Sequence, residues 1–536
     1  MADIIFYNGR IYTLAGEKRV SALAVTGYRI EAVGKDREIL ALAGSSTQLI
    51  DLKGKCVLPG FTDTHCHAYY KGLARRQIPL NGVRSVEEIV RRGREFLEKN
   101  RPPEGTWLVA GGFDHNHFDV PRLPAARDLD RISTRHPILL ERICGHIGSV
   151  NTLALSLTGF DREITFEGGG GVEKDEQGRP TGVIVETALD LIKTRIPKPD
   201  KNTVKEAFYA AFEEANTYGV TGMHTDDIPG SSLQTVLDAC RELEEEGRMT
   251  VRIWEEVEEP RIPELEEFLA SGLRTGSGNR FFRIGNIKLI ADGSLGARTA
   301  LLQAPYSDDP ENCGVRVYTQ DELEEVVLAA HKAGMQVACH AIGDGAVRQC
   351  AAALRRAYES DGKDLRNRIV HCQFLNEEIL ETMAAGHVCA DIQPAFLASD
   401  LPIIHERMGE RDAGGYAWKS LTEKHLILGG GSDCPVETFN PLWGIHCAVN
   451  RTDAAGQPEG GWHPEQKLTV EEAVRLYTTG GAMLSLEEDC KGTLEPGKYA
   501  DFAVLDHDIF TVSPDRICEI RNIMTVMDGR IVYRID

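Results

Sequence analysis

The chain has 536 residues, of which 42% are hydrophobic and 26% are charged, and its formal net charge is -22. This composition is typical of a globular protein with a large core and argues against a disordered chain, while the acidic balance disfavours nucleic acid and anionic membranes as partners. No run of about 18 apolar residues predicts a membrane span, and residues 1–10 lack the pattern of a signal peptide, so we expect a cytoplasmic protein.

The two ends of the chain have similar sequence patterns. The first fifty residues predict short strands separated by turns, and the last forty-odd do so again, with an Asn-Gly-Arg turn signal at 8–10 and an Asp-Gly-Arg signal at 528–530. We therefore predict that residues 1–56 and 489–536 build one small β-structure together. Everything between them is then an insertion into it.

The central region, residues 57–488, alternates short apolar runs with longer amphipathic stretches, which is the pattern of repeated βα units around a parallel sheet. Eight runs qualify as strands, the number that a (β/α)8 barrel needs. We expect an α/β fold of this kind, with strands within 56–65, 220–227, 250–257, 284–293, 335–344, 367–375, 388–396 and 426–436.

Between the first and second of these strands, residues 77–216 are too many for one crossover helix. We expect this segment to be an elaboration over the barrel mouth that supplies substrate contacts. Its candidates are Trp107, Phe113 and His146, although either aromatic side chain could equally serve in packing. Elsewhere, Arg298 is a candidate for binding a carboxylate or carbonyl group, with simple surface solvation as its alternative.

The first predicted barrel strand ends in the sequence DTHCH. Alternate residues of a strand point to the same side, so His65 and His67 would both project into the barrel and could bind one metal ion. Taken alone, a His-x-His pair is more often incidental. Its position at the end of a barrel strand favours the metal-binding interpretation.

Four further candidates lie at the ends of later strands: Lys288, His340, His371 and Asp433. Functional residues of such barrels come from those strand ends, each from a different strand, because the βα loops converge there. A His-x-His pair followed by Lys, His, His and Asp on successive strands is hard to obtain by chance. The set therefore predicts a metal centre at one rim of the barrel.

Lys288 is the least expected member, because burying an ammonium group is costly. One alternative is a lysine that extends to the rim or pairs with a carboxylate such as Asp292. A buried lysine can also lose its proton, add carbon dioxide and become a carbamate whose oxygens bridge two ions. We favour the carbamate.

Cysteines adjoin four of the predicted ligands: Cys66, Cys339, Cys372 and Cys434. Thiolate ligation of zinc is one interpretation. Strand alternation argues against it, because the neighbour of an inward-pointing ligand should point outward toward the helices. We expect these cysteines to pack as small apolar side chains.

In the order and completeness of its motifs the sequence resembles the amidohydrolase superfamily, in its YtcJ-like branch, which includes N-substituted formamide deformylases. The resemblance covers nearly the whole chain and rests on NGRIYTL, VLPGFTDTHCH, GVTGMHTDD, IKLIADGSLGARTA, HAIGDGAV, VHCQFL, LGGGSDCPVE, NPLWGIHCAVNR and GTLEPGKYADFAVLD. It implies a barrel together with a β-sandwich built from both termini.

The resemblance also implies a function, namely metal-dependent hydrolysis of a carbon–nitrogen bond other than a peptide bond, by metal-bound hydroxide. It implies one or two zinc ions, with His65 and His67 on the more buried ion, His340 and His371 on the more exposed one, and Lys288 as a carbamate between them. Asp433 would ligate and act as base, with His371 assisting catalysis.

Two other functions stay open: a mononuclear deaminase of the same fold, and a non-catalytic scaffold. The expected partner is a small-molecule substrate, with a second copy of the chain as a possible homodimer partner.

Overall fold

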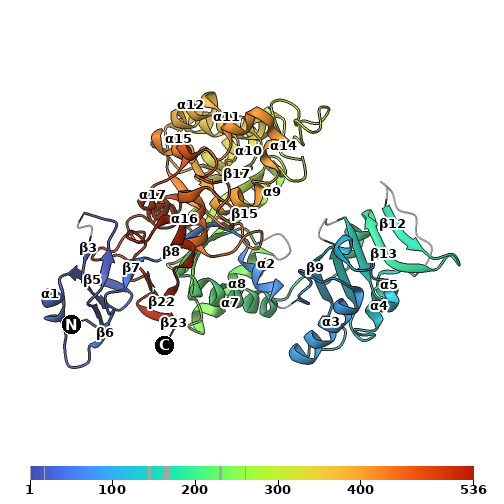
Figure 1. Cartoon of the computed structure of the whole chain (residues 1–536), viewed down its shortest axis with the longest axis horizontal. Helices are drawn as coiled ribbons and strands as arrows, with labels where there is room; N and C mark the ends of the chain where they lie inside the picture. Colours follow the sequence, from blue (N-terminus) through green and yellow to red (C-terminus); the bar gives the residue numbers. More distant parts are fainter. Residues whose placement is uncertain are drawn as a thin grey trace. The chain divides into compact units, whose positions relative to one another are not determined.

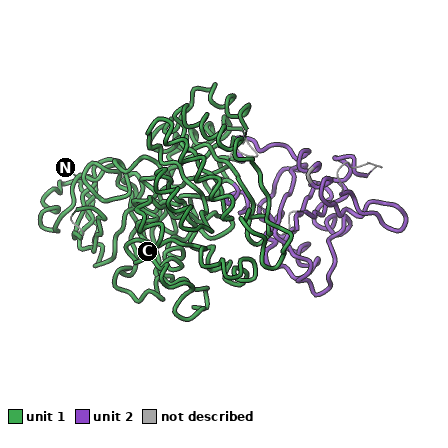
Figure 2. The backbone as a smooth tube through the Cα atoms, turned by 90° about the horizontal axis from the view of Figure 1, so that it is seen from above, with its two compact units in different colours: residues 1–69, 204–536 green, residues 70–203 purple. Residues whose placement is uncertain are grey.

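The computed structural model describes residues 2–16, 19–75, 77–142, 146–161, 170–227, 232–259 and 261–535. The chain forms two compact units, one made of residues 1–69 and 204–536 and the other of residues 70–203 (Figure 2). Within the described ranges, no helix has both the length and the apolar character that crossing a membrane requires.

Eight parallel strands form the central sheet of the first unit, in the order in which they occur along the chain. All eight strands predicted from the sequence are present, and the predicted barrel fold is confirmed. The strands are β8 (Phe61–Cys66), β14 (Val220–Thr225), β15 (Arg252–Glu258), β16 (Phe282–Ile290), β17 (Gln336–Ala341), β18 (Arg368–His371), β19 (Cys389–Ile392) and β20 (Leu428–Gly430).

The first and last of these strands, β8 and β20, lie next to each other and bring the sheet round on itself. The chain segments that follow them are joined by backbone hydrogen bonds. The amide of Asp433 donates to the carbonyl of His65, and the amide of His67 donates to the carbonyl of Cys434, each at 2.7 Å. The end of the first strand and the segment after the eighth are thereby held at one edge of the barrel.

Helices connect the barrel strands, and in Figure 1 they surround the sheet. Several begin at a capping side chain; in α10, for example, Thr319 and Glu322 form a capping box. The helices of this unit are α1 (Asp36–Leu40), α7 (Lys201–Thr217), α8 (Leu233–Glu245), α9 (Ile262–Ala270), α10 (Gln320–Lys332), α11 (Asp344–Asp361), α12 (Glu377–Ala385), α13 (Pro394–Asp400), α14 (Ile404–Met408), α15 (Trp418–Glu423), α16 (Pro441–Asn450), α17 (Val470–Arg475) and α18 (Gly481–Leu484). Helix α2 (Ala68–Ala74) follows β8 directly.

Two further sheets contain strands from the ends of the chain (Figure 1). One consists of N-terminal strands, and in the other an N-terminal strand pairs with a C-terminal one. Their shared core joins residues far apart in sequence, as in the edge-to-face contact of Phe6 with Phe502. One sheet has the order β5-β4-β1-β6, with bounds Arg29–Gly34, Ala22–Thr26, Ile4–Tyr7 and Gln48–Asp51. The other has the order β23-β22-β21-β7-β2-β3, with bounds Arg530–Arg534, Asn522–Met527, Phe502–Leu505, Cys56–Pro59, Arg10–Tyr12 and Arg19–Val20.

The second unit is a five-stranded sheet with hydrophobic cores on its two faces. Ile138 and Leu140 belong to one core and Leu139, between them, to the other, as strand alternation requires. Its elements are α3 (Val86–Asn100), β9 (Leu108–Phe113), α4 (Ala126–Asp130), β10 (Ile138–Arg142), β11 (Ile147–Val150), α5 (Thr152–Thr158), β12 (Gly170–Lys174), β13 (Pro180–Glu186) and α6 (Thr187–Lys193). This unit spans residues 70–203, and helix α7, which begins at Lys201, continues into the barrel unit.

Candidate metal centre

The six side chains predicted as metal ligands gather at one end of the barrel. Nε2 of His67 lies 3.1 Å from Oδ1 of Asp433, and Nε2 of His65 lies 3.5 Å from the same oxygen. Nζ of Lys288 lies 3.3 Å from Nδ1 of His65. The His371 ring lies 5.5 Å from that of His65 and 4.5 Å from that of His340, between ring centroids. Residues from the ends of four strands, β8, β16, β17 and β18, and from the segment after β20 thus share one site.

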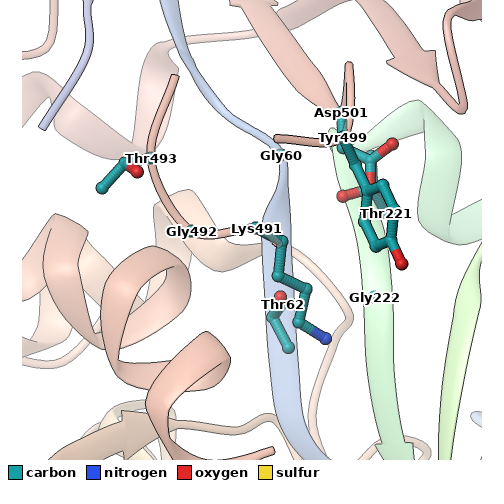
Figure 3. Close-up of a pocket in the computed structure, with 9 residues that line it drawn as sticks. All are labelled: Gly60, Thr62, Thr221, Gly222, Lys491, Gly492, Thr493, Tyr499 and Asp501. Atoms are coloured by element: carbon teal, nitrogen blue, oxygen red, sulfur yellow. The ribbon is translucent and has the colours of Figure 1, made fainter. Parts of the chain in front are cut away.

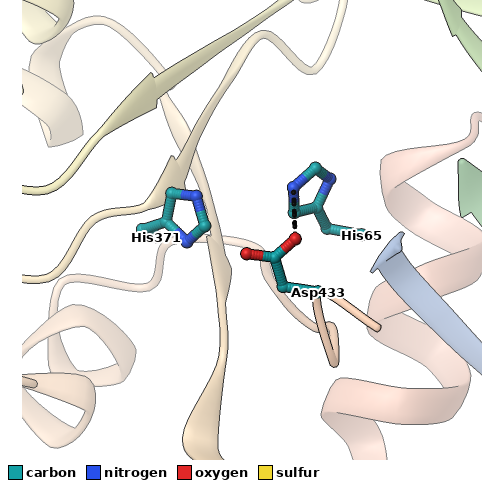
Figure 4. A group of neighbouring side chains, drawn as sticks. All are labelled: His65, His371 and Asp433. Atoms are coloured by element: carbon teal, nitrogen blue, oxygen red, sulfur yellow. Dashed lines mark ion pairs between the residues drawn. The ribbon is translucent and has the colours of Figure 1, made fainter. Parts of the chain in front are cut away.

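Three of these residues form the tightest group. His65, His371 and Asp433 each present one potential ligand atom, and these atoms lie within 4.8 Å of one another (Figure 4). All three side chains are buried. Nδ1 of His371 is also buried and has no hydrogen-bond partner within the described part of the chain. Imidazole nitrogens and a carboxylate oxygen at this spacing suit a divalent metal ion.

Two histidines are oriented by backbone carbonyls. Nδ1 of His67 lies 2.8 Å from the carbonyl of Asp226, and Nε2 of His340 lies 3.1 Å from that of Gly293. A ring that donates one N–H to a carbonyl keeps the lone pair of its other nitrogen for an ion. These contacts leave Nδ1 of His340 and Nε2 of His67 facing the site. In the metal-free protein Nε2 of His67 donates to Asp433, and it would have to lose that proton to bind an ion.

The backbone is strained at two members of the group. His371 has a φ of 70° and Asp433 a φ of 55°, in the left-handed region that residues other than glycine rarely adopt. Such conformations persist where the surrounding structure enforces them, and they concentrate at functional sites. Positive φ values also occur at turns elsewhere in the described chain, as at Asn8 and Lys53, and here it is the barrel rim that holds both side chains in place.

Burial and neighbouring charges shift the pKa values of the site's histidines in opposite directions. Burial and the nearby Lys288 ammonium lower the pKa of His65 to about 4, and burial together with His340 holds the pKa of His371 well below its usual value. Burial alone would lower the pKa of His67, but the Asp433 carboxylate raises it to about 9. His65 and His371 are therefore neutral at pH 7, as metal-binding histidines must be.

The Asp433 carboxylate is held in its ionised form. Although burial favours the protonated acid, the hydrogen bond from His67 and the nearby rings of His65 and His371 lower the pKa of Asp433 below its usual value. At neutral pH this side chain is an acceptor only. Asp433 can therefore receive a proton.

Sequence reasoning missed Glu256, in the middle of β15. Its side chain is fully buried, and Oε2 lies 3.2 Å from Nζ of Lys288 and 3.4 Å from Nδ1 of His65. Lys288 thus pairs with Glu256 and not with Asp292, which accepts hydrogen bonds from the backbone amides of Leu301 and Gly343. The available signal was a carboxylate inside a strand that the barrel buries on both faces.

Three of the proposed substrate residues lie in the second unit. Phe113 is fully buried in one of that unit's cores and therefore offers no surface to a ligand, while Trp107 packs against the other core. His146 is exposed, with Nδ1 3.1 Å from a carboxylate oxygen of Glu186. For both aromatic side chains the observed contacts are those of the packing alternative.

Arg298, in the barrel unit, is held by carboxylates. Its guanidinium lies 2.6 Å from Asp308 and 3.8 Å from Glu406. These pairs already satisfy its charge, so an anionic group of a substrate would have to compete with them.

The cysteines beside the predicted ligands are all fully buried. Sγ of Cys372 lies 3.9 Å from the sulfur of Met383 in helix α12, on the outer side of the barrel. The expected packing role is confirmed for this residue. Among the described residues, no cysteine belongs to a group with metal-binding spacing.

Two hollows lie away from the predicted ligands. A cavity of about 10 Å³ lies near the starts of β8 and β14, lined among others by Thr62, Thr221 and Lys491 (Figure 3). It has room for about one water molecule and not for a substrate. In the second unit a hollow of about 480 Å³ is lined by residues including Arg101 and His136, none of them a predicted ligand.

Comparison with known proteins places the chain in a family. Residues 48–533 match the model of the amidohydrolase family. The putative amidohydrolase YtcJ of Bacillus subtilis is 34% identical over 99% of each chain, and the N-substituted formamide deformylase of Arthrobacter pascens is 24% identical over 99% of this chain and 98% of its own.

A solved structure is similar along almost the whole length. An uncharacterised metal-dependent hydrolase from Pyrococcus furiosus is 32% identical, with a TM-score of 0.78, covering 95% of this chain and all of its own. The fold and the full-length similarity agree. The chain belongs to the amidohydrolase family.

Proposed function

We propose that this protein hydrolyses a carbon–nitrogen bond, other than a peptide bond, in a small amide, formamide or cyclic amide. The observation that carries the proposal is the group formed by His65, His371 and Asp433, with His67, His340 and Lys288 beside it. A related deformylase, similar over its whole length, supports the choice of bond.

Zinc is the proposed ion, because it binds both imidazole nitrogens and carboxylate oxygens. His65, His67, His340, His371 and Asp433 would hold it, with Lys288 as a carbamate if two ions are present. When bound, it would supply Lewis-acid activation of water and of the substrate's carbonyl group.

Asp433 is the proposed proton carrier. Its carboxylate is ionised at neutral pH and lies among the ligands, so it can take the proton of the attacking water and deliver it to the departing nitrogen. Acid–base assistance of this kind typically contributes a factor of about 10² to 10⁴ in rate. His371 is proposed to assist by orienting the substrate's oxygen from the end of β18.

Apolar side chains border the site and favour a substrate with an apolar substituent. The ring of Phe396 stacks on that of His371 at 5.7 Å. Ile290 follows Lys288 by two residues, so both face the barrel interior, and it is 38% exposed. Val436, three residues after Asp433, is 65% exposed. Large exposed apolar side chains beside a polar centre are typical of ligand sites.

A mononuclear deaminase is the second candidate. One observation favours it: Lys288 pairs as an ammonium with Glu256, and three ligands at the observed spacing suffice for one ion. The number of ions per chain separates the two functions.

The remaining expectations concern the cellular setting. We propose the cytoplasm, because the cysteines that the structure describes are all free thiols. A homodimer, and the absence of nucleic-acid and membrane partners, likewise remain proposals.

The test is metal analysis of the purified protein, followed by a screen of N-formyl, N-acyl and cyclic amides that detects amine release. We expect metal in the protein and chelator-sensitive hydrolysis of at least one class. A folded, metal-loaded protein that releases amine from none of them, or ammonia from an amino-substituted ring instead, would exclude the proposed reaction.

A further inference from the structure

Charged side chains occupy the barrel interior next to the predicted ligands. Glu256, Arg368 and Asp391 are all fully buried there. Bulky branched apolar residues usually fill the interior of such barrels. A buried ion pair adds little net stability compared with apolar packing, so its presence calls for another explanation.

Arg368, at the start of β18, is fixed from several directions. Its guanidinium donates to Oε1 of Glu256 at 2.6 Å and to the side-chain oxygen of Asn286 at 2.8 Å. It also donates to the side chain of Gln336 and to the carbonyl of Leu484, each at 3.3 Å. Side chains from β15, β16 and β17 therefore determine where this group lies.

Glu256 uses its two oxygens for different contacts. Oε1 accepts the hydrogen bond from Arg368, whereas Oε2 faces Lys288 at 3.2 Å and Nδ1 of His65 at 3.4 Å. If His65 binds an ion through Nε2, which points at Asp433, its Nδ1 carries the hydrogen. Oε2 of Glu256 is then the acceptor that fixes the orientation of this ring.

We propose that Glu256, held in place by Arg368, is a positioning residue for the metal centre, acting through His65 and Lys288. This inference rests on the proposed function, since it assumes that these two residues face a metal ion. Carboxylates behind ligating histidines fix the ring and its tautomer, and losing them typically lowers metal affinity about 10- to 100-fold.

Two variants test the two ends of the arrangement. Glu256→Gln keeps the shape of the side chain, but its amide group must face either Arg368 or the His65–Lys288 side, so one set of contacts is lost. Arg368→Lys keeps the positive charge. A lysine ammonium, however, lacks the several N–H groups of a planar guanidinium and cannot donate to Glu256, Asn286 and Gln336 at the same time. Each variant leaves all six predicted ligands unchanged.

Arg252→Lys is the matched control. Arg252 is a buried arginine at the start of β15, and it pairs with Asp501 at 2.6 Å and with Asp528 at 3.1 Å. None of its described contacts is with a predicted ligand. This variant therefore weakens a comparable buried ion pair that starts from the same strand and contacts none of the predicted ligands.

The measurement is zinc affinity of the metal-stripped full chain, by competition with a chromophoric chelator, together with the absorption spectrum of the Co²⁺ form and the thermal midpoint of the metal-free protein. We expect Glu256→Gln and Arg368→Lys to bind zinc about 10- to 100-fold more weakly with an altered Co²⁺ spectrum. Arg252→Lys should lower the thermal midpoint while keeping affinity and spectrum.

The outcomes separate the two proposals. If either of the first two variants is folded and binds zinc with wild-type affinity and spectrum, the positioning role is wrong while the proposed function stands. If affinity falls equally in Arg252→Lys, the effect is general destabilisation and the positioning role is again wrong. If the wild-type protein binds no divalent ion, both proposals fail.

Discussion

Nε2 of His67, at the end of the first barrel strand, lies 3.1 Å from Oδ1 of Asp433, which follows the eighth. Backbone hydrogen bonds between the same two segments reinforce this contact. The side-chain pair thus lies where the sheet comes round on itself, and an ion bound there would tie the first segment of the barrel to the last. Stability and metal binding should therefore be coupled at this point.

The first prediction concerns the pH dependence of the metal-free protein. The pKa of His67 is about 9 in the folded protein, against an ordinary value of 6.5. Because the folded pKa is the higher one, the pair stabilises the fold fully below pH 6.5, and this contribution is lost as the pH rises through 9. A difference of 2.5 units corresponds to roughly 3 kcal/mol.

Unfolding of the chelator-treated wild type and of His67→Asn, followed from pH 6 to 9.5, measures this contribution. The free energy of unfolding of the wild type should exceed that of the variant at pH 6, and the difference should shrink as the pH rises to 9.5. Curves that stay parallel would show that the Asp433–His67 pair does not act as an ion pair.

The second prediction concerns Asp433→Asn. The variant keeps the size of the side chain but cannot accept a proton from water, so turnover should fall by about 10² to 10⁴, the range for losing an acid–base group. Its circular dichroism should match that of the wild type, and metal content serves as the control. Wild-type turnover in the metal-loaded variant would remove Asp433 from the reaction.

Much of the barrel could be predicted because its strands are buried on both faces and therefore read as apolar runs. Four of the predicted ligands could be identified from the sequence for a related reason. His65, Lys288, His340 and His371 lie at or near the ends of those runs, where barrel folds place functional groups. The position of a residue within its strand can thus be predicted from the local sequence alone.

Glu256 could not be assigned in the same way, because its role depends on which strands are neighbours. In the sheet, β15 pairs with β16 and Glu258 lies opposite Lys288. Glu256, two residues earlier on the same side of β15, reaches Lys288 with its carboxylate. The sequence alone does not reveal which residues of two neighbouring strands lie beside each other. A similar limit applies to Phe113, whose burial depends on the separate core of the second unit.

The third prediction concerns Phe396, whose ring stacks on that of His371. Phe396→Ala should weaken binding of benzohydroxamate to the metal-loaded protein more than that of acetohydroxamate, because only the former carries an apolar ring to bury. Removing one aromatic contact costs about 1 to 2 kcal/mol, or about 5- to 30-fold in affinity. Phe510→Ala is a control in a distant aromatic pair with Tyr12. An equal loss for both ligands would contradict an apolar substrate pocket at Phe396.

The fourth prediction concerns the state of Lys288. If it is a carbamate between two ions, the metal-loaded wild type should hold two ions per chain and give a ¹³C carbamate signal after growth or reconstitution with ¹³C-bicarbonate. Lys288→Ala should then lose one ion and the signal. Lys491→Ala is the matched control, since Lys491 is also buried and paired with a glutamate, Glu487, yet lies at the small cavity near the strand starts. One ion per wild-type chain and no labelled carbon would instead identify the Lys288–Glu256 ion pair as the functional state, and would favour the mononuclear deaminase.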